Sequence, residues 1–174
     1  MTLRPEHFRH LRSVPPGRHP MFHHIFRADP LTVRDALVYM RQRFLGSAAE
    51  EVIAKVELAL AEVLNNICKH GGRDDAPRPG SALHPPLIHL CIVRHVGGIA
   101  CAVTDDGIGL PPACLVAPPS PAHPAGEPLP EGGFGWFLIQ GLTQSLCYYR
   151  EDHRNCLAFT VPFNPGQFSG PISG

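Results

Sequence analysis

Glu62-Val-Leu-Asn-Asn-Ile-Cys-Lys-His70, in the middle of the longest helical pattern of the chain, is the stretch that decides the fold. On this predicted helix, apolar residues recur every three or four positions: Val52, Val56, Ala59, Leu60, Val63 and Ile67. The polar residues of the stretch are Glu62, Asn66, Lys69 and His70. Their offsets of four, seven and eight positions place them on one stripe of the helix. A polar stripe is usually the solvated side of a helix, so its meaning depends on the rest of the sequence.

Alternating helical and strand patterns predict one domain over residues 21–163. The expected elements are a strand at 22–26, helices from Pro30 to Gly46, from Ser47 to Gly71-Gly72 and at 134–145, and strands at 87–94, 99–104, 146–150 and 157–162. Asp29 is expected to cap the first helix, and Pro30 suits the first helical position because no N–H is needed there. Ser47 and Glu50 have the spacing of a capping box, which predicts the start of the second helix.

Length and charge limit the classes of protein to consider. A chain of 174 residues suits one domain with its own core. Fifteen basic and fifteen acidic side chains cancel, which disfavours nucleic acid and anionic membranes as partners. No apolar run approaches the roughly 20 residues of a membrane span, so we expect a cytoplasmic protein. Residues 1–20 are a basic, proline-rich extension, and residues 164–174 are expected to form a flexible tail.

Neither the cysteines nor the histidines predict a metal site or a disulfide framework. The six cysteines are scattered through apolar segments without paired spacing, which indicates small buried side chains. Of the eleven histidines, five lie in or beside the N-terminal extension without ligand spacing: His7, His10, His19, His23 and His24. We expect these five histidines to be solvated.

Two further segments contain glycines at the ends of predicted elements. Asp105-Asp-Gly-Ile-Gly109 follows a predicted strand, and Gly132-Gly-Phe-Gly135 opens a predicted helix. Glycines at a helix start expose backbone N–H groups at its positive end, where phosphate oxygens bind. The chain has no P-loop lysine motif, and the second segment has the glycines with which a helix start can bind phosphate without one. The apolar residues after it, Phe137, Leu138 and Ile139, are expected to anchor this helix in the core.

In their order and spacing, the three segments resemble the N, G1 and G2 boxes of the Bergerat-fold ATPases, also called the GHKL or HATPase_c superfamily. The resemblance covers residues 22–162. Chain length and the run from Gly132 into Phe-Leu-Ile are most similar to the anti-sigma-factor serine kinases of bacterial partner-switching systems. The resemblance implies an α/β two-layer sandwich, in which three helices cover one face of a mixed, largely antiparallel sheet. It also implies that ATP and Mg²⁺ bind between the helices.

The resemblance assigns roles to the polar stripe of the second helix. The position of Glu62 corresponds to the family's general base, and a carboxylate can accept a hydroxyl proton. Asn66 corresponds to the magnesium ligand, since an amide oxygen is a hard ligand that adds no charge beside phosphates. Lys69 stands where related sensor kinases place a phosphate-contacting lysine, and His70 lies on the same nucleotide-binding stripe.

The two glycine-containing segments also receive roles from the resemblance. Asp105 corresponds to the aspartate that accepts a hydrogen bond from the adenine amino group, while Gly107 and Gly109 let the backbone turn around the base. A carboxylate faces the carbonyl oxygen of guanine unfavourably, so the site is expected to select ATP over GTP. The implied phosphate cradle is Gly133, Phe134 and Gly135. Trp136 either stacks near the nucleotide or packs in the core, and packing is favoured.

The chain departs from the family pattern at two places. No Lys or Arg occurs from His95 to Tyr149, although the serine kinases commonly have a basic residue in the segment that covers ATP. In this chain that segment is 110–132, which contains eight prolines. The second departure is Arg154-Asn155-Cys156, where relatives often have Gly-Thr. We also expect Asp106 to be exposed.

The function implied by the resemblance is ATP-dependent phosphorylation of a serine on a STAS-domain anti-anti-sigma protein. The same resemblance implies that the kinase binds a sigma factor or another regulated protein. Relatives often dimerise, which makes a homodimer a further candidate assembly. Two alternatives stay open: a non-catalytic ATP-binding regulatory module, which the segment without basic residues favours, and a stand-alone catalytic domain of the histidine-kinase type.

Overall fold

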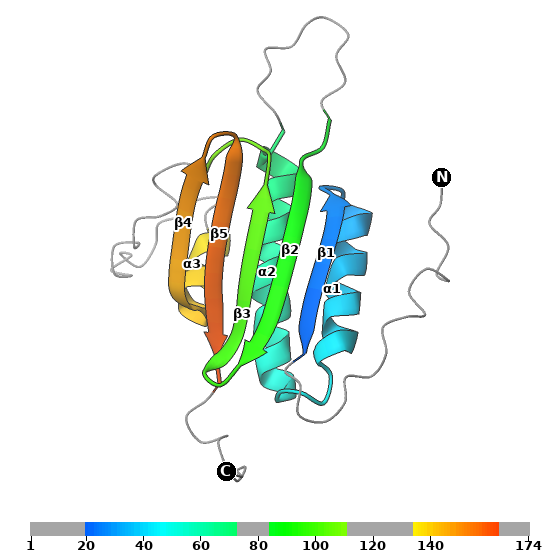
Figure 1. Ribbon diagram of the computed structural model, residues 1–174, viewed down its shortest axis with the longest axis vertical. Coiled ribbons are helices and arrows are strands. Elements are labelled where there is room, and N and C mark those ends of the chain that lie inside the picture. The colour runs from blue at the N-terminus through cyan, green and yellow to red at the C-terminus, as the bar shows by residue number, and fades with distance from the viewer. Residues whose placement is uncertain (1–19, 73–83, 111–133, 164–174) are drawn as a thin grey trace, which may run out of the picture.

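The computed structural model describes residues 20–72, 84–110 and 134–163 (Figure 1). The elements in chain order are β1 (Met21–Arg27), α1 (Pro30–Phe44), α2 (Glu50–His70), β2 (Leu87–His95), β3 (Gly98–Asp105), α3 (Phe134–Leu142), β4 (Gln144–Glu151) and β5 (Arg154–Pro162). The predicted extension and tail, and the proline-rich segment after Leu110, lie outside the described residues. None of the described helices is both long and apolar enough to cross a membrane.

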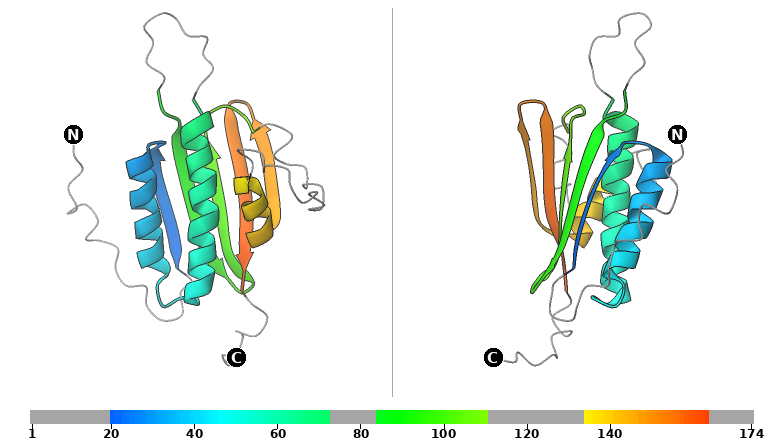
Figure 2. Two further views of the ribbon diagram at one scale, coloured as in Figure 1. Left: turned by 180° about the vertical axis from the view of Figure 1, so that it is seen from behind. Right: turned by 45° about the vertical axis from the view of Figure 1, so that its right-hand side comes forward.

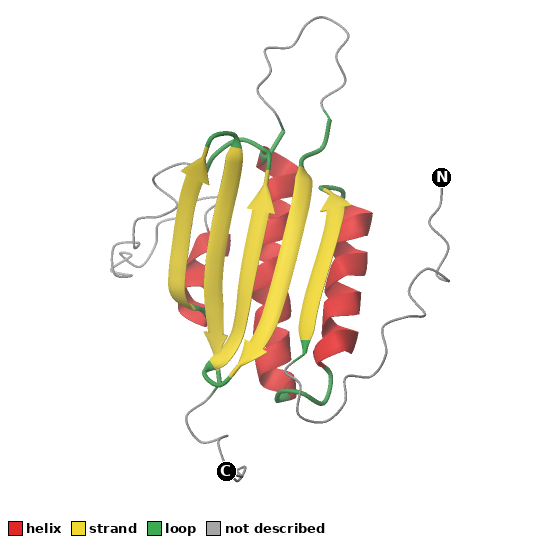
Figure 3. Ribbon diagram, viewed as in Figure 1, coloured by secondary structure: helices red, strands yellow, loops and turns green. Residues whose placement is uncertain are grey.

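The five strands form one sheet in the order β1-β2-β3-β5-β4. Each of the pairings between these strands is antiparallel, so the described sheet is not the mixed one that was expected. Helices α1, α2 and α3 lie on the same face of the sheet, as the view from behind and the view turned by 45° show (Figure 2). This arrangement is the predicted α/β two-layer sandwich, and Figure 3 separates its helix layer from its strand layer.

The inward side chains of the strands follow the period of two that the sequence indicates. On β2, β3 and β5 the buried apolar residues are Ile88, Leu90, Ile92, Ile99, Cys101, Val103, Leu157, Phe159 and Val161. Of the described cysteines, all of which were expected to be buried, Cys101 is buried, Cys68, Cys91 and Cys156 are partly buried, and Cys147 is exposed. The same alternation continues to Asp105 at the end of β3 and Asn155 near the start of β5, which are also buried. Because Asp105 pairs with Asn155 in the β3–β5 register, two polar side chains meet at one end of the core.

The helices bury their apolar stripes against this sheet face. On α1 and α2 the buried residues are Val33, Ala36, Met40, Phe44, Val52, Ile53, Val56, Ala59, Leu60, Val63 and Leu64. The predicted cap of α1 is present, since the Asp29 side chain accepts a 2.9 Å hydrogen bond from the N–H of Leu31. Ile67, which was expected in the same core stripe of α2, is only partly buried and packs against the core.

The predicted capping box at the start of α2 is wrong. Ala49 is the N-cap of this helix, and no side chain caps it. The Ser47 hydroxyl instead donates a 2.6 Å hydrogen bond to the carbonyl of Phe44 at the end of α1, and the Glu50 carboxylate pairs with Arg41. Both side chains of the expected box therefore interact with residues of α1 instead of capping α2.

Two expectations for the third helix also need correction. The helix ends at Leu142 rather than at residue 145, because Ser145 has a left-handed φ of 57° and β4 already begins at Gln144. Phe137 does not anchor the helix, since 47% of this residue is exposed. Ile139 is fully buried and holds α3 on the core.

Candidate functional site

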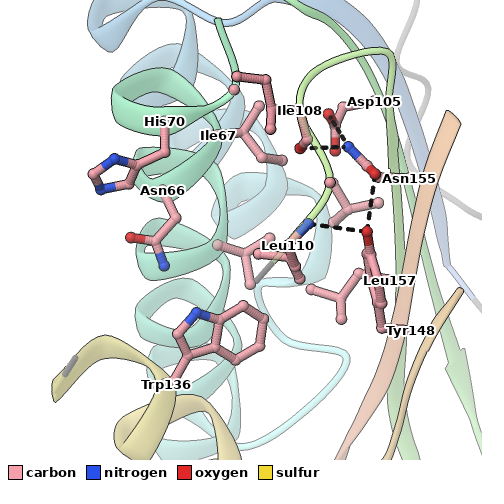
Figure 4. Close-up of a pocket in the computed structure, with 14 residues that line it drawn as sticks. Asn66, Ile67, His70, Asp105, Ile108, Leu110, Trp136, Tyr148, Asn155 and Leu157 are labelled. Atoms are coloured by element: carbon pink, nitrogen blue, oxygen red, sulfur yellow. Dashed lines mark hydrogen bonds between the residues drawn. The ribbon is translucent and has the colours of Figure 1, made fainter. Parts of the chain in front are cut away.

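A cavity of about 370 Å³ lies between the C-terminal half of α2, the loop after β3, Trp136 of α3, and residues of β4 and the start of β5 (Figure 4). This volume is in the usual range of small-molecule sites. Its lining combines a few polar groups with mostly apolar ones: Val63, Asn66, Ile67, His70, Gly71, Val103, Asp105, Ile108, Gly109, Leu110, Trp136, Tyr148, Asn155 and Leu157.

The predicted polar stripe of α2 divides into residues inside and outside this cavity. Asn66 and His70 line it and lie on the same side of the helix. Lys69 is exposed and does not line it. Glu62 is partly buried next to the cavity, where α3 begins. The side chain of Asn66 has no hydrogen-bond partner within the described ranges, so its amide oxygen is available to a ligand.

The first turn of α3 lies directly against Glu62. A Cβ atom added to Gly135 would collide with Oε2 of Glu62 and lie 3.8 Å from Nδ2 of Asn66. Glycine is therefore the residue that lets the start of α3 approach this carboxylate so closely. The N–H groups of a first helical turn have no partner within the helix, so Glu62 stands beside donors that suit an anion.

The neighbouring residues of α3 are only partly described. Gly133 lies outside the described residues, and the side chain of Phe134 is not described, so their predicted contacts with phosphate stay predictions. Trp136 fits both alternatives considered from the sequence, because it lines the cavity and also packs against the core.

Asp105 is the buried carboxylate of the site. Only 6% of the residue is exposed, and Oδ1 accepts hydrogen bonds from the N–H of Gly107 at 2.8 Å and from Nδ2 of Asn155 at 2.9 Å. Burial raises the pKa of Asp105 above its usual value, while the two hydrogen bonds and the charge of Arg150 oppose this rise. Oδ2 accepts no hydrogen bond from the part of the chain that the structure describes, and can therefore accept one from a ligand.

The loop after β3 is pressed against the end of α2. A Cβ atom on Gly107 would collide with the carbonyl oxygen of Gly71, and the N–H of Ile108 donates a 3.3 Å hydrogen bond to that oxygen. Asp106 is not exposed as expected. It is partly buried, and its Oδ1 accepts a 2.7 Å hydrogen bond from the N–H of Leu87 at the start of β2. The loop is thus held by β2 through Asp106 and by the end of α2 through Ile108.

Three functional residues were missed by the motif analysis: Tyr148 and Arg150 on β4 and Asn155 on β5. Asn155 bonds to Asp105, and both Tyr148 and Arg150 donate to Oδ1 of Asn155, at 3.0 and 2.5 Å. The available signal was the period of two along β5, which places Asn155 on the same face as the buried Leu157. The partner of Asn155 could not be read from this pattern, because Asp105 is 50 positions away.

Residues 26–161 match the family model HATPase_c_2, described as the histidine kinase-like ATPase domain. This match covers most of the 174 residues. The chain belongs to the histidine kinase-like ATPase family. A comparison with curated proteins finds no match.

The cavity fits the ATP-binding function of a histidine kinase-like ATPase domain. The free oxygen of Asp105 provides an acceptor at one end, and the apolar side chains of Ile108 and Leu157 provide walls for a flat base. The other end is formed by Asn66 and Trp136, close to Glu62 and the first turn of α3. A nucleotide with its base at Asp105 would direct its phosphates toward this turn, where helix N–H groups suit anions.

Proposed function

We propose that the chain is an ATP-dependent protein serine/threonine kinase. Its proposed substrate is a STAS-domain anti-anti-sigma protein, and it would sequester a sigma factor or another regulator when that partner is phosphorylated. The position of Glu62 carries the proposal: its partly buried carboxylate lies against the first turn of α3, next to Asn66, which lines the cavity.

The proposed reaction is a direct transfer. The serine oxygen of the partner protein attacks the γ-phosphorus of ATP, the bond to the oxygen that bridges the β- and γ-phosphates breaks, and ADP leaves. Glu62 accepts the proton of the serine hydroxyl. Most of the rate enhancement in such a transfer comes from positioning and from charge stabilisation, so the close contact between Glu62 and Gly135 matters as much as basicity.

Magnesium fits this site through Asn66. The amide oxygen of Asn66 is a hard, neutral ligand at the cavity wall, and its side chain makes no hydrogen bond within the described ranges. A bound magnesium ion would offset phosphate charge at that end. Its contribution is needed, because the chain has no Lys or Arg from His95 to Tyr149 and because Arg150 is already bonded at the opposite end of the cavity.

The absence of basic residues between His95 and Tyr149 also favours a second candidate function. In this alternative the chain holds a regulator and uses bound ATP only to set its own conformation. Such a module breaks no bond to phosphorus, so it needs no basic side chain to stabilise the charge of a transition state. A partner protein that supplies a cation would restore the kinase function.

Incubation of the protein with γ-³²P-ATP, magnesium and a candidate STAS-domain protein tests the proposal. Acid-stable label on serine of the partner is the expected result, and Glu62→Gln should abolish most of it. Glu51→Gln is the matched control, since Glu51 is an exposed carboxylate on the same helix that pairs with Lys55. Acid-labile label on histidine would indicate a histidine-kinase activity. ATP binding without any label would favour the regulatory module.

A further inference from the structure

A polar cluster behind Asp105 is not part of the three sequence motifs. It consists of Tyr148 and Arg150 on β4 and Asn155 on β5 (Figure 4 shows Tyr148 and Asn155). Arg150 is the direct cross-strand partner of Asn155, and Asn155 is the cross-strand partner of Asp105. Arg150, Asn155 and Asp105 therefore form a row across three neighbouring strands, which ends at the carboxylate of the cavity. Tyr148 lies beside this row on β4 and donates to Asn155.

The surroundings of Asn155 permit one orientation of its amide. Its Nδ2 faces acceptors only: Oδ1 of Asp105 at 2.9 Å, the carbonyl of Ile108 at 3.0 Å and the carbonyl of Gly107 at 3.3 Å. Its Oδ1 faces the guanidinium of Arg150, which can only donate. A flipped amide would place its oxygen against a carboxylate and two carbonyls, and its NH₂ group against a cation.

Tyr148 enforces the same orientation. Its hydroxyl oxygen accepts a 3.0 Å hydrogen bond from the N–H of Leu110, so its proton points to Oδ1 of Asn155, also at 3.0 Å. Two donors thus converge on one amide oxygen. In a buried network each donor polarises the amide and strengthens the hydrogen bond that its NH₂ group makes to the next acceptor. That acceptor is Asp105.

We propose that Asn155, oriented by Arg150 and Tyr148, is a positioning residue that makes the cavity select a 6-aminopurine over a 6-oxopurine. The inference rests on the binding of ATP in this cavity. By occupying Oδ1 of Asp105, the Asn155 amide fixes the plane of the carboxylate and directs Oδ2 to the ligand as an ionised acceptor. An acceptor matches the amino group of adenine and repels the oxygen of a 6-oxopurine.

Loss of this arrangement should weaken discrimination for a definite chemical reason. Asp105 is buried, and its hydrogen bond from Asn155 favours the ionised form. Without an oriented donor, a larger fraction of Asp105 carries a proton. A protonated carboxyl group presents an O–H to the ligand, which suits the 6-oxo oxygen and not the 6-amino group. Affinity for the wrong base then rises relative to ATP.

The test compares the dissociation constants of ATP and inosine triphosphate, whose bases differ in the 6-amino or 6-oxo group and in the hydrogen on N1 that accompanies the 6-oxo group. The variants are Arg150→Met and Tyr148→Phe, with Arg150→Lys as the conservative replacement. Arg154→Met is the matched control, because it removes a cation from the same hairpin outside the row. Wild type and control should prefer ATP by about tenfold or more, the equivalent of one hydrogen bond to a charged group.

In Arg150→Met the preference should fall several-fold, Tyr148→Phe should show a smaller fall, and Arg150→Lys should retain most of it. As the pH is lowered, Arg150→Met should begin to lose affinity for ATP at a higher pH than wild type does, because Asp105 is protonated more easily in this variant. A purely structural role would change both dissociation constants equally. An unchanged ATP preference in both Arg150→Met and Tyr148→Phe overturns the inference, whereas failure of wild type and Arg154→Met to bind ATP overturns the ATP site itself.

Discussion

Gly107→Ala tests whether the loop after β3 must pass as close to α2 as the structure shows. The added Cβ would collide with the carbonyl oxygen of Gly71 and lie 2.9 Å from Oδ1 of Asp105 and 3.0 Å from Cα of Gly71. Two of these neighbours are backbone atoms, which cannot rotate away as a flexible side chain can. Overpacking of this kind costs about 1–3 kcal/mol of unfolding free energy.

The melting temperature should fall by about 2–4 °C for each kcal/mol in a chain of this size. The affinity for ATP should also fall, by about tenfold or more, because the shifted loop displaces the carboxylate that accepts a hydrogen bond from the adenine amino group. Loss of unfolding free energy would not by itself cause this fall. Gly141→Ala is the control, since no atom lies within 4 Å of its added Cβ. Differential scanning calorimetry and ATP titration measure both effects. A Gly107→Ala protein with wild-type stability and affinity would refute the close contact on which the site depends.

Three further variants separate catalysis, metal binding and folding. Glu62→Ala should keep its ATP affinity while phosphoryl transfer falls by about 10²–10⁴-fold, and a wild-type transfer rate would remove the proposed base. Asn66→Ala should weaken ATP binding in magnesium but not in EDTA, so equal losses in both would exclude it as a ligand. His24, which was expected to be solvated, is instead partly buried on β1 between the rings of Phe22 and Phe26. This burial, and secondarily the charge of His23, lowers the pKa of His24 below 6.5. In the unfolded chain His24 is therefore protonated at a higher pH than in the folded chain, so the unfolding free energy should fall as pH drops below about 6.5. His24→Leu should flatten this slope in urea titrations at several pH values, and an unchanged slope would show that another group causes it.

Local patterns were sufficient to predict the layers of the fold. Period-two strands and the long amphipathic α2 are repeated over enough residues to be unambiguous, and the cap at Asp29 needs only neighbouring backbone. The capping box at Ser47 failed because a hydroxyl and a carboxylate have other partners within reach, here the carbonyl of Phe44 and the side chain of Arg41. Phe137 was misplaced because a helix that is apolar all round cannot bury every side against a single sheet.

The site was predictable where it consists of motif residues and unpredictable where it depends on strand register. Asp105 and Asn66 were identified from the sequence, and both line the cavity. The polar cluster of Tyr148, Arg150 and Asn155 was not, because the bond from Asn155 to Asp105 exists only after β5 pairs with β3. The sequence showed Asn155 as a departure from the family pattern. The structure shows that its amide donates hydrogen bonds to Asp105 and to the carbonyl of Ile108.

Calorimetric titration of ATP with magnesium into wild type and Asp105→Asn is the most direct test of the central claim, that the buried carboxylate at the end of β3 receives the base of a bound adenine nucleotide. We expect one saturable site per chain in wild type. Asp105→Asn should bind about 1–3 kcal/mol more weakly, because its amide can no longer offer an ionised acceptor at the same position. No binding by wild type at millimolar ATP, or equal affinity in the two proteins, would contradict the claim.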